Sequence, residues 1–239
     1  MSLKDQKVVI MGGTSGIGFA TAKAVASAGA VVVVTGRDPE KIKRATSKLH
    51  NTVEGALVDA MSLDALNDFY KNVGTFDHLV LAVSGKVGGG PFKSLSIDVL
   101  KQAFEAKFFA YFMAVQASLQ TLRTGGSIVF VTASSARTSY PGTSGLAAVN
   151  GALEAMIPTL ALELKPTRVN AVSPGVIDTP WWDVWPKEQR EAAFAQIAAS
   201  TPVGRVGQPE DIAQAILLLL ENGFMTGTVI ECDGGIRIK

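Results

Sequence analysis

The chain has 239 residues, of which 47% are apolar and 18% charged, and its net charge is +1. This length suits one large α/β domain or two small ones. The near-neutral charge excludes the strong positive field typical of proteins that bind nucleic acids or membrane surfaces. A single cysteine, Cys232, excludes a disulfide framework, and two histidines, His50 and His78, are too few for most zinc sites. With no signal peptide and no bilayer-length apolar run, the sequence predicts a cytoplasmic protein without a metal or a membrane contact.

Strand-like and helix-like segments alternate along the whole chain. Apolar runs predict a first strand starting at Val8 and further strands at 31–35, 53–58, 78–83, 127–132, 168–171 and 228–230. Helical patterns lie between them at 20–28, 41–49, 62–73, 97–121, 147–163 and 209–221, with an irregular amphipathic stretch at 181–199. No linker divides the pattern. It predicts one α/β domain over residues 1–239, a doubly wound parallel sheet with helices on both faces.

A glycine-rich turn joins the first strand to the first helix. Gly12, Gly13, Gly16 and Gly18 fall in one short stretch. Glycine tolerates positive φ and lets a phosphate approach the backbone, while the following helix directs its positive dipole end at the turn. A strand–helix turn without a ligand is the alternative. In a doubly wound sheet, ligands bind at the carboxyl ends of the strands, and the residues expected there after the other strands are Arg37, Asp59, Ser84, Ala133 and Pro174.

The end of the second strand bears on which nucleotide binds. Cofactors without a 2′-phosphate favour a carboxylate there, but the chain has Gly36 followed by Arg37. A guanidinium matches a phosphate group, so the sequence favours NADP(H) over NAD(H). The alternatives are that Arg37 is a solvated loop charge or pairs with Asp38. Asp59 is a candidate to hold the adenine amino group, with a helix cap as its alternative.

Motifs spread over the whole chain match those of one enzyme family. Gly12, Gly16 and Gly18 match its Gly-x3-Gly-x-Gly turn, and Ser173-Pro174-Gly175 with Thr179 matches its motif after strand six. The C-terminal matches are Pro202-x-Gly204-Arg205-x-Gly207-x-Pro209-Glu210-Asp211-Ile212, Thr226-Gly227 and Asp233-Gly234-Gly235. On these residues the chain resembles the short-chain dehydrogenase/reductase family, of the kind that includes acyl-carrier-protein ketoacyl reductases. The resemblance implies a seven-stranded Rossmann fold of order 3-2-1-4-5-6-7, a lid at about 176–207, and a homodimer or homotetramer.

The same resemblance completes the predicted cofactor site. The residues expected to bind NADP(H) are Gly12, Thr14, Ser15, Gly16, Ile17, Gly18, Arg37, Asp59, Ala60, Ala82, Ser84, Gly85, Lys107, Thr132, Asn150, Pro174, Gly175, Ile177 and Thr179. The implied partner is a small-molecule substrate. Nucleic acids are not expected as partners.

The four residues that carry the family's chemistry are all replaced here. The family uses Asn, Ser, Tyr and Lys, the last two as Tyr-x3-Lys. The matching positions in this sequence are Lys107, Ala133, Leu146 and Asn150. Asparagine and lysine have thus exchanged places, which would return an ammonium group to the nicotinamide ribose from the opposite helix.

Lys107 shares a predicted helix face with apolar residues. Leu100, Ala103 and Ala114 lie on that face, whereas Lys101 lies on the other side. A lysine in such a place must pair with a ribose, a phosphate or Asn150 if it is buried. Burial would lower its pKa and make it a candidate proton donor. An exposed lysine on a solvated helix face is the alternative.

Other candidates for the missing acid lie just before the helix predicted at 147–163. Ser134 follows the position of the family's serine, and Tyr140 lies in the loop before Leu146, where packing on the surface is its alternative. The lid carries Trp181, Trp182 and Trp185. They suggest an apolar or aromatic substrate, or else they pack the lid onto the body.

Three functions stay open at this point. The chain is an NADP(H)-dependent oxidoreductase with a non-standard catalytic set acting on a carbonyl or alcohol, or an NADP(H)-binding protein without catalysis that acts as a sensor or partner subunit. The third is a non-redox enzyme that uses Lys107. The retained glycine turn supports all three.

Overall fold

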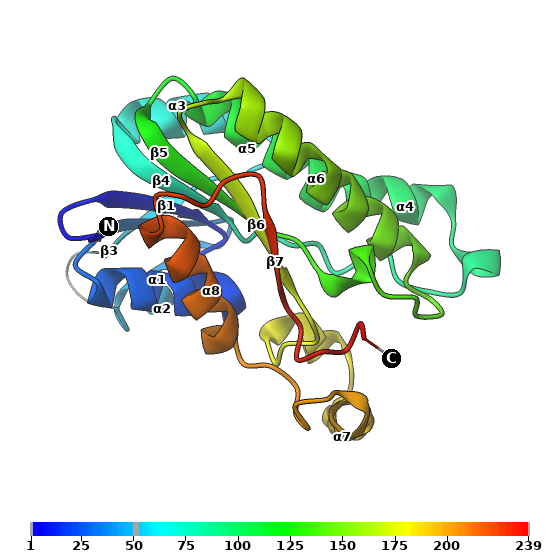
Figure 1. The fold of residues 1–239 in the computed structure, drawn as a ribbon. Helices are drawn as coiled ribbons and strands as arrows, with labels where there is room; N and C mark the ends of the chain where they lie inside the picture. The colour runs from blue at the N-terminus through cyan, green and yellow to red at the C-terminus, as the bar shows by residue number, and fades with distance from the viewer. Residues whose placement is uncertain (1, 50–52, 239) are drawn as a thin grey trace.

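Figure 1 presents a computed structural model of the protein, which describes residues 2–49 and 53–238. Within these residues, seven parallel strands form one sheet in the order β3-β2-β1-β4-β5-β6-β7, which confirms the predicted topology. The strands are β1 (Lys7–Met11), β2 (Val31–Gly36), β3 (Val53–Leu57), β4 (Phe76–Leu81), β5 (Leu122–Val131), β6 (Arg168–Pro174) and β7 (Val229–Cys232). The predicted strands thus all form, with ends that differ by a few residues.

Helices cover both faces of the sheet (Figure 1). One face carries α1 (Gly16–Ser27), α2 (Pro39–Thr46) and α8 (Pro209–Glu221). The other carries α3 (Leu63–Val73), α4 (Ile97–Ala103), the π-helical turn η2 (Phe104–Phe109), α5 (Ala110–Ser118) and α6 (Ser144–Glu163). Short 3-10 turns are η1 (Phe92–Ser94), η3 (Ser134–Ala136) and η4 (Pro180–Val184), and η4 leads into α7 (Lys187–Ser200), drawn in orange at the bottom of Figure 1.

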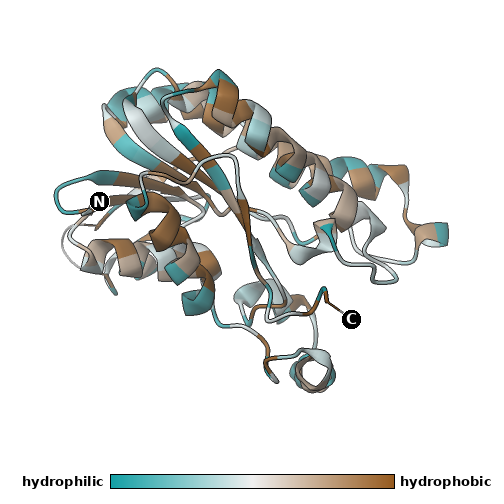
Figure 2. Cartoon of the chain, viewed as in Figure 1, coloured by the Kyte–Doolittle hydropathy of each residue, from teal (hydrophilic) through white to brown (hydrophobic). Residues whose placement is uncertain are grey.

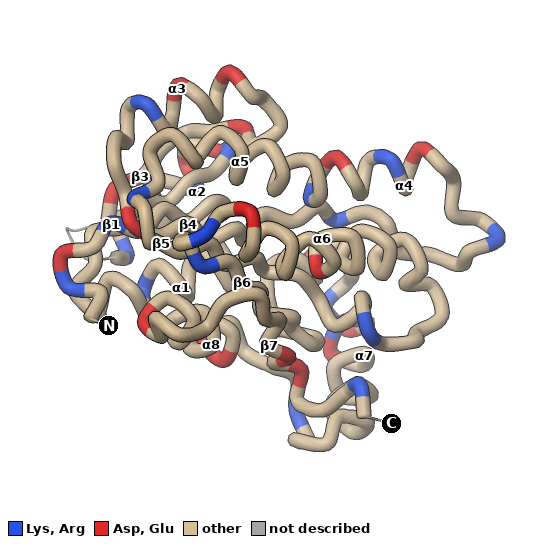
Figure 3. Tube along the Cα trace, turned by 45° about the horizontal axis from the view of Figure 1, so that its top comes forward, with Lys and Arg blue, Asp and Glu red and all other residues tan. Residues whose placement is uncertain are grey.

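The core lies in two layers, one on each face of the sheet. Along β1, Val8 and Ile10 belong to the layer under α1 and α8, while Val9 and Met11 belong to the opposite layer. Because successive side chains of a strand point to opposite faces, a strand covered on both sides must be apolar at every position. Brown, apolar segments accordingly run through the sheet in Figure 2, and charges of both signs are scattered around the periphery in Figure 3.

Two predicted boundaries were wrong, and both errors lie around β5. The helix predicted at 97–121 is divided by η2 and ends at Ser118, and β5 begins at Leu122 rather than at 127. Gly125 and Gly126, interpreted as a helix break, lie inside the strand. Gly125 has a φ of +81°, and a Cβ on Gly126 would meet the Asp77 carbonyl oxygen at 2.2 Å. The glycines therefore permit an irregularity in β5 beside β4. In the sequence, two glycines at such an irregularity cannot be told from two glycines that end a helix.

Of the two histidines, His78 has a structural role in this part of the fold. His78 is buried, with Nδ1 2.8 Å from the Ser127 hydroxyl and Nε2 2.6 Å from Gln6 Oε1. Burial, with a smaller effect of Arg168, lowers the pKa of His78 to about 4. His50 lies outside the described residues. Within the described ranges, no three His, Cys, Asp or Glu side chains form a group suited to a metal ion.

Helix α6 is long and apolar. Among the described residues, it alone has the length and composition that a membrane-crossing helix needs. Its inward-facing Leu153 and Ile157 are fully buried in the core. This is the pattern of a helix packed on a sheet, and a soluble core helix meets the same test of length and composition.

Helix α3 offers a direct test of the packing. Leu66 is fully buried, whereas Leu63 on the same helix is 44% exposed. We expect Leu66→Ala to lower the free energy of unfolding by about 2–5 kcal/mol because it removes buried methyl groups and leaves a cavity. Leu63→Ala should change it by less than about 0.5 kcal/mol. Urea denaturation of both variants checks this, and equal losses would contradict the described packing.

Candidate active site

The turn between β1 and α1 is shaped for close approach of an anion. Gly12 and Gly16 have φ values of +84° and +52°, in the region that favours glycine. A Cβ on Gly18 would meet the Gly12 carbonyl oxygen at 2.2 Å. Ser15, the N-cap of α1, makes no capping hydrogen bond with its side chain, so the first-turn N–H groups stay available. The backbone thus fits the phosphate of a nucleotide.

Arg37 lies at the end of β2, beside this turn. Gly36 allows the approach, since a Cβ there would be 2.9 Å from Thr14 Cγ2. The Asp38 carboxylate accepts from the backbone N–H groups of Glu40 (2.9 Å) and Lys41 (3.2 Å), so it caps α2 and does not pair with Arg37. Arg37 is exposed and forms no hydrogen bond or ion pair with the described part of the chain. Its guanidinium remains available for a ligand.

The edge of the sheet at which the strands reach their carboxyl ends is here called the rim. Other segments of this rim lie against the glycine turn. A Cβ on Gly12 would meet the Val83 amide nitrogen at 2.9 Å, which places the segment Ala82–Gly85 against the turn. On the lid side, a Cβ added to Gly16 would lie 3.3 Å from Thr179 Cβ. Asp59 accepts from the Met61 amide at 3.0 Å, and Ser62, not Asp59, caps α3 by accepting from the Ala65 amide. The helix-cap alternative for Asp59 was therefore wrong, and Asp59 is exposed at the rim.

The same rim gathers the remaining predicted cofactor residues. Ala60 is buried directly after Asp59, Ile177 is buried where the lid begins, and Ile17 lies in the first turn of α1. Pro174 ends β6, and the Gly175 amide donates to the Cys232 carbonyl at 3.1 Å. A ligand on the glycine turn would therefore meet backbone from four different strand ends.

Lys107 is buried inside η2 and faces α6. Its Nζ donates to Asn150 Oδ1 at 2.7 Å and to the Thr132 carbonyl oxygen at 3.0 Å. The predicted burial and the predicted contact with Asn150 are confirmed. Asn150 is fixed in turn, because its Nδ2 donates to the Leu146 carbonyl (2.9 Å) and to the Ser135 hydroxyl (3.2 Å). The amide orientation therefore presents its oxygen to the lysine.

The surroundings of Lys107 shift its protonation. Burial lowers the pKa of its amine to about 7, and the nearby negative charge of Glu154 acts in the opposite direction. The ring centroid of Tyr111 lies 5.9 Å from Nζ, close enough for a cation–π contact. The site therefore holds an amine that exchanges a proton near neutral pH.

One buried carboxylate was missed in the sequence analysis. Glu154 Oε1 accepts from the Thr132 hydroxyl at 2.8 Å, and Oε2 accepts from Arg137 Nε at 2.8 Å. Glu154 follows Asn150 by four residues, a spacing that puts two side chains on the same face of a helix. That spacing was the available signal.

Comparison with known proteins identifies the fold and the motifs. The model of a family described as enoyl-(acyl carrier protein) reductase matches residues 12–237. A short-chain dehydrogenase/reductase of Stachybotrys chlorohalonatus is 32% identical over 257 aligned residues, which cover 100% of this chain and 99% of that protein. The chain belongs to the short-chain dehydrogenase/reductase family. A 3-oxoacyl-[acyl-carrier-protein] reductase of Thermotoga maritima is 30% identical with both chains covered in full, and a 3α-hydroxysteroid dehydrogenase of Mediterraneibacter gnavus is 31% identical with 99% of each covered.

Solved structures of the family superpose on the whole chain. A small-chain dehydrogenase in complex with NADPH has a TM-score of 0.84 at 30% identity, with 99% of this chain and 100% of that chain covered. The MalC reductase/Diels-Alderase of Malbranchea aurantiaca has a TM-score of 0.90 at 28% identity, with 99% and 97% covered. The Rossmann domain of this short-chain dehydrogenase/reductase is therefore shared by proteins whose names state different activities.

Leu146 and Ala133, the positions predicted to match the family's tyrosine and serine, have no hydroxyl, and Leu146 lies on the same helix as Asn150. Leu146 is one turn before it on α6, and its Cδ2 would be 3.4 Å from a Cβ placed on Gly88. Ala133 lies at the end of β5, just before η3. Of the predicted substitute acids, Ser134 has no hydrogen bond to Asn150 among the described residues, whereas its neighbour Ser135 accepts one. Tyr140 is 43% exposed in the turn before α6, as its packing alternative proposed.

The three tryptophans of the lid have different contacts. Trp182 packs edge-on against Trp181, Trp185 and Phe194, with ring centroids 4.7, 5.3 and 5.6 Å away. Its indole therefore joins η4 to α7 within the lid, and these ring contacts do not reach the body of the domain. Trp181 instead donates from Nε1 to the Gly85 carbonyl oxygen at 2.9 Å. This bond links the lid to the loop after β4.

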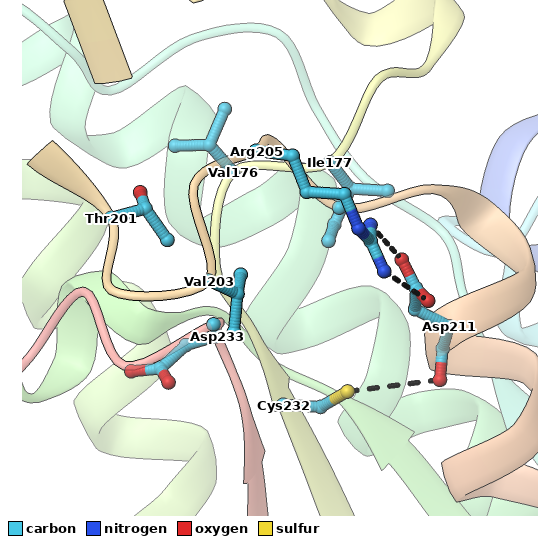
Figure 4. Close-up of a pocket in the computed structure, with 10 residues that line it drawn as sticks. Val176, Ile177, Thr201, Val203, Arg205, Asp211, Cys232 and Asp233 are labelled. Atoms are coloured by element: carbon cyan, nitrogen blue, oxygen red, sulfur yellow. Dashed lines mark hydrogen bonds and ion pairs between the residues drawn. The ribbon is translucent and has the colours of Figure 1, made fainter. Parts of the chain in front are cut away.

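The far end of the lid is anchored to α8 (Figure 4). Arg205 forms two hydrogen bonds with Asp211, at 2.7 and 2.9 Å, and a cavity of about 170 Å³ lies beside this pair. The Cys232 thiol lines the cavity and lies 3.7 Å from the Asp211 carbonyl oxygen, as Figure 4 shows. The lid is thus tied at both ends, by Trp181 and by Arg205.

The lowered pKa of Lys107 has a measurable effect on stability. In the unfolded chain a lysine has a pKa of about 10.4, so between pH 7 and pH 10 the unfolded state binds more protons than the folded state. The free energy of unfolding should therefore rise with pH in this window by up to about 1.4 kcal/mol per pH unit relative to Lys107→Met. Urea denaturation of both proteins from pH 7 to 9 measures the difference. A constant difference across this range would contradict the assigned pKa.

Proposed function

We propose that this protein is an NADP(H)-dependent oxidoreductase that interconverts a carbonyl and an alcohol on a small molecule, with Lys107 as the proton donor and acceptor. The observation that carries the proposal is a buried amine, held 2.7 Å from Asn150 Oδ1, in a site where the expected tyrosine and serine are Leu146 and Ala133. The proposal assigns to Lys107 the role for which the family uses a tyrosine.

The cofactor assignment rests on the rim of the sheet. The glycine turn and the first turn of α1 would hold the diphosphate, and Arg37 would bind the 2′-phosphate with a guanidinium that the described residues leave unpaired. A relative of known structure carries NADPH. When bound, NADPH supplies a hydride for the substrate carbon. Thr132, Asn150 and Lys107 would face the nicotinamide ribose.

Lys107 would supply the proton. Two of its three ammonium hydrogens are directed at Thr132 and Asn150, which leaves one for the substrate oxygen. In reduction, that N–H proton moves to the oxygen of the carbonyl as the carbon gains hydride, and Lys107 becomes a neutral amine. In oxidation, the neutral amine takes the proton of the alcohol. A pKa of about 7 suits both directions near neutral pH.

The substrate side of the proposal rests on the lid. Trp181 presents an aromatic wall next to Gly85, which favours an apolar or aromatic substrate. Relatives named for hydroxysteroid and oxoacyl chemistry support the carbonyl/alcohol class. The exposed Phe109, Phe112 and Leu162 form an apolar surface on the α5–α6 side, which supports a homodimer or homotetramer. A single thiol, Cys232, is in keeping with a cytoplasmic location.

A second function is favoured by Leu146. Its side chain lies against the loop at Gly88 and has no proton to donate. A protein that binds NADP(H) without turnover, as a sensor or partner subunit, would need the rim but not an acid. The two functions differ in whether NADPH is consumed.

Arg37 tests the cofactor assignment. We expect NADPH to bind more tightly than NADH, and Arg37→Ala to weaken NADPH binding by about tenfold or more, as the loss of a charged hydrogen bond of about 1.5–3 kcal/mol implies. NADH binding should be unchanged. Arg123→Ala is the control, since Arg123 pairs with Asp77 at the opposite end of β5. Fluorescence titration measures both affinities, and equal binding of the two nucleotides by the wild type would exclude Arg37 as the phosphate ligand.

Lys107 tests the reaction. Wild-type protein should oxidise NADPH with members of a panel of aldehydes and ketones, and Lys107→Met should reduce kcat by about 10²–10⁴, the usual contribution of a general acid. Lys101→Met, at an exposed position on α4, should retain full activity. Tight NADPH binding with no turnover of any carbonyl compound would instead support the binding protein.

A further inference from the structure

We propose that Glu154 is a positioning residue that sets the charge of Lys107, acting through Thr132 from the buried face of α6. The inference rests on the proposed function in that Lys107 is taken as the group that exchanges the proton. It extends the site beyond the residues that touch Lys107 directly.

Thr132 connects the carboxylate to the amine. Its carbonyl oxygen accepts from Lys107 Nζ at 3.0 Å, and its hydroxyl donates to Glu154 Oε1 at 2.8 Å. The same hydroxyl lies 3.2 Å from the Val172 carbonyl oxygen, and the Thr132 amide donates to that oxygen at 2.9 Å. The threonine is thus fixed from three sides. Glu154 and Lys107 are held at a constant separation by one residue of the strand end.

Arg137 pairs with the buried carboxylate of Glu154. A buried carboxylate is costly unless it is paired and hydrogen-bonded. Glu154 has only 8% of its side chain exposed, and Arg137 Nε donates to its Oε2 at 2.8 Å. Arg137 is 41% exposed and also pairs with Glu231 at 2.7 Å, so its positive charge is shared with a second carboxylate and screened by water. Because Glu154 is buried and Arg137 is exposed to water, the negative charge of Glu154 is screened less than the positive charge of Arg137, and it acts on Lys107.

The groups around Lys107 leave Glu154 as the charge that opposes burial. From its own helix, Lys107 faces the Tyr111 ring, from β5 the Thr132 carbonyl, and from α6 Asn150 and Glu154. Burial lowers the pKa of Lys107, and the charge of Glu154 raises it. Removing that charge while keeping the hydrogen bond from Thr132 would leave burial unopposed. The amine would then lose its proton at lower pH.

The test is a direct titration of Lys107. In protein labelled with ¹³C at lysine Cε, the pH dependence of the Lys107 signal, assigned by its loss in Lys107→Met, gives the midpoint. We expect Glu154→Gln, which keeps the size and the acceptor oxygen, to lower the midpoint by about one pH unit or more. Glu163→Gln removes an exposed carboxylate from the end of the same helix and should leave it unchanged. A folded Glu154→Gln protein with the wild-type midpoint would overturn the proposal.

A second measurement covers the case in which Glu154→Gln does not fold. In wild-type protein labelled at the Glu carboxyl carbon, the Glu154 signal should shift at the Lys107 midpoint, and that inflection should vanish in Lys107→Met. Its absence from the wild type would overturn the proposal. Neither titration depends on turnover. The effect of Glu154 on Lys107 is therefore tested independently of the proposed reaction. If the reaction is as proposed, Glu154→Gln also moves the alkaline fall of the reduction rate to lower pH, and a merely structural role would leave it in place.

Discussion

The hydrogen bond between Lys107 and Asn150 is the contact on which the proposed chemistry of this site depends. A lysine amine inside a protein needs acceptors, because an unpaired buried charge is too costly to keep. The fold supplies two oxygens, one from Asn150 on α6 and one from the Thr132 carbonyl at the end of β5. Only when both elements are correctly packed do they meet the amine. The site is therefore a product of the core and not of one loop.

The candidate nucleotide site and the proposed catalytic groups rest on different kinds of structure in this protein. The nucleotide rim is mostly backbone, shaped by glycines that no other residue could replace without collision, such as Gly18 against the Gly12 carbonyl. The proposed reacting groups are side chains. The chain matches its family over residues 12–237, and a site built in this way would keep its nucleotide rim while the side chains around Lys107 differ.

Most of the fold follows from patterns in the sequence, and parts of the site do not. Apolar runs predicted the seven strands, and helical periodicity placed Lys107 on the buried face. The contact with Asn150 was predicted from the resemblance to the family, whose asparagine and lysine positions match Lys107 and Asn150. The π-helical turn at Phe104–Phe109 and the start of β5 were missed, because glycines and aromatic residues do not distinguish a helix end from a strand irregularity. Glu154 was missed for another reason. Its partners, Thr132 and Arg137, are distant in sequence, so only the packed structure brings them together.

The π-helical turn that carries Lys107 has a consequence for the contacts of its amine. A turn with one extra residue rotates everything after it by about 100° compared with a regular α-helix. Lys107 lies within that turn, and Tyr111, which faces its amine, lies just beyond it. In a straight helix the residues after the turn, Tyr111 among them, would be rotated relative to Lys107. The contact between the amine and the Tyr111 ring therefore depends on the local winding of the backbone.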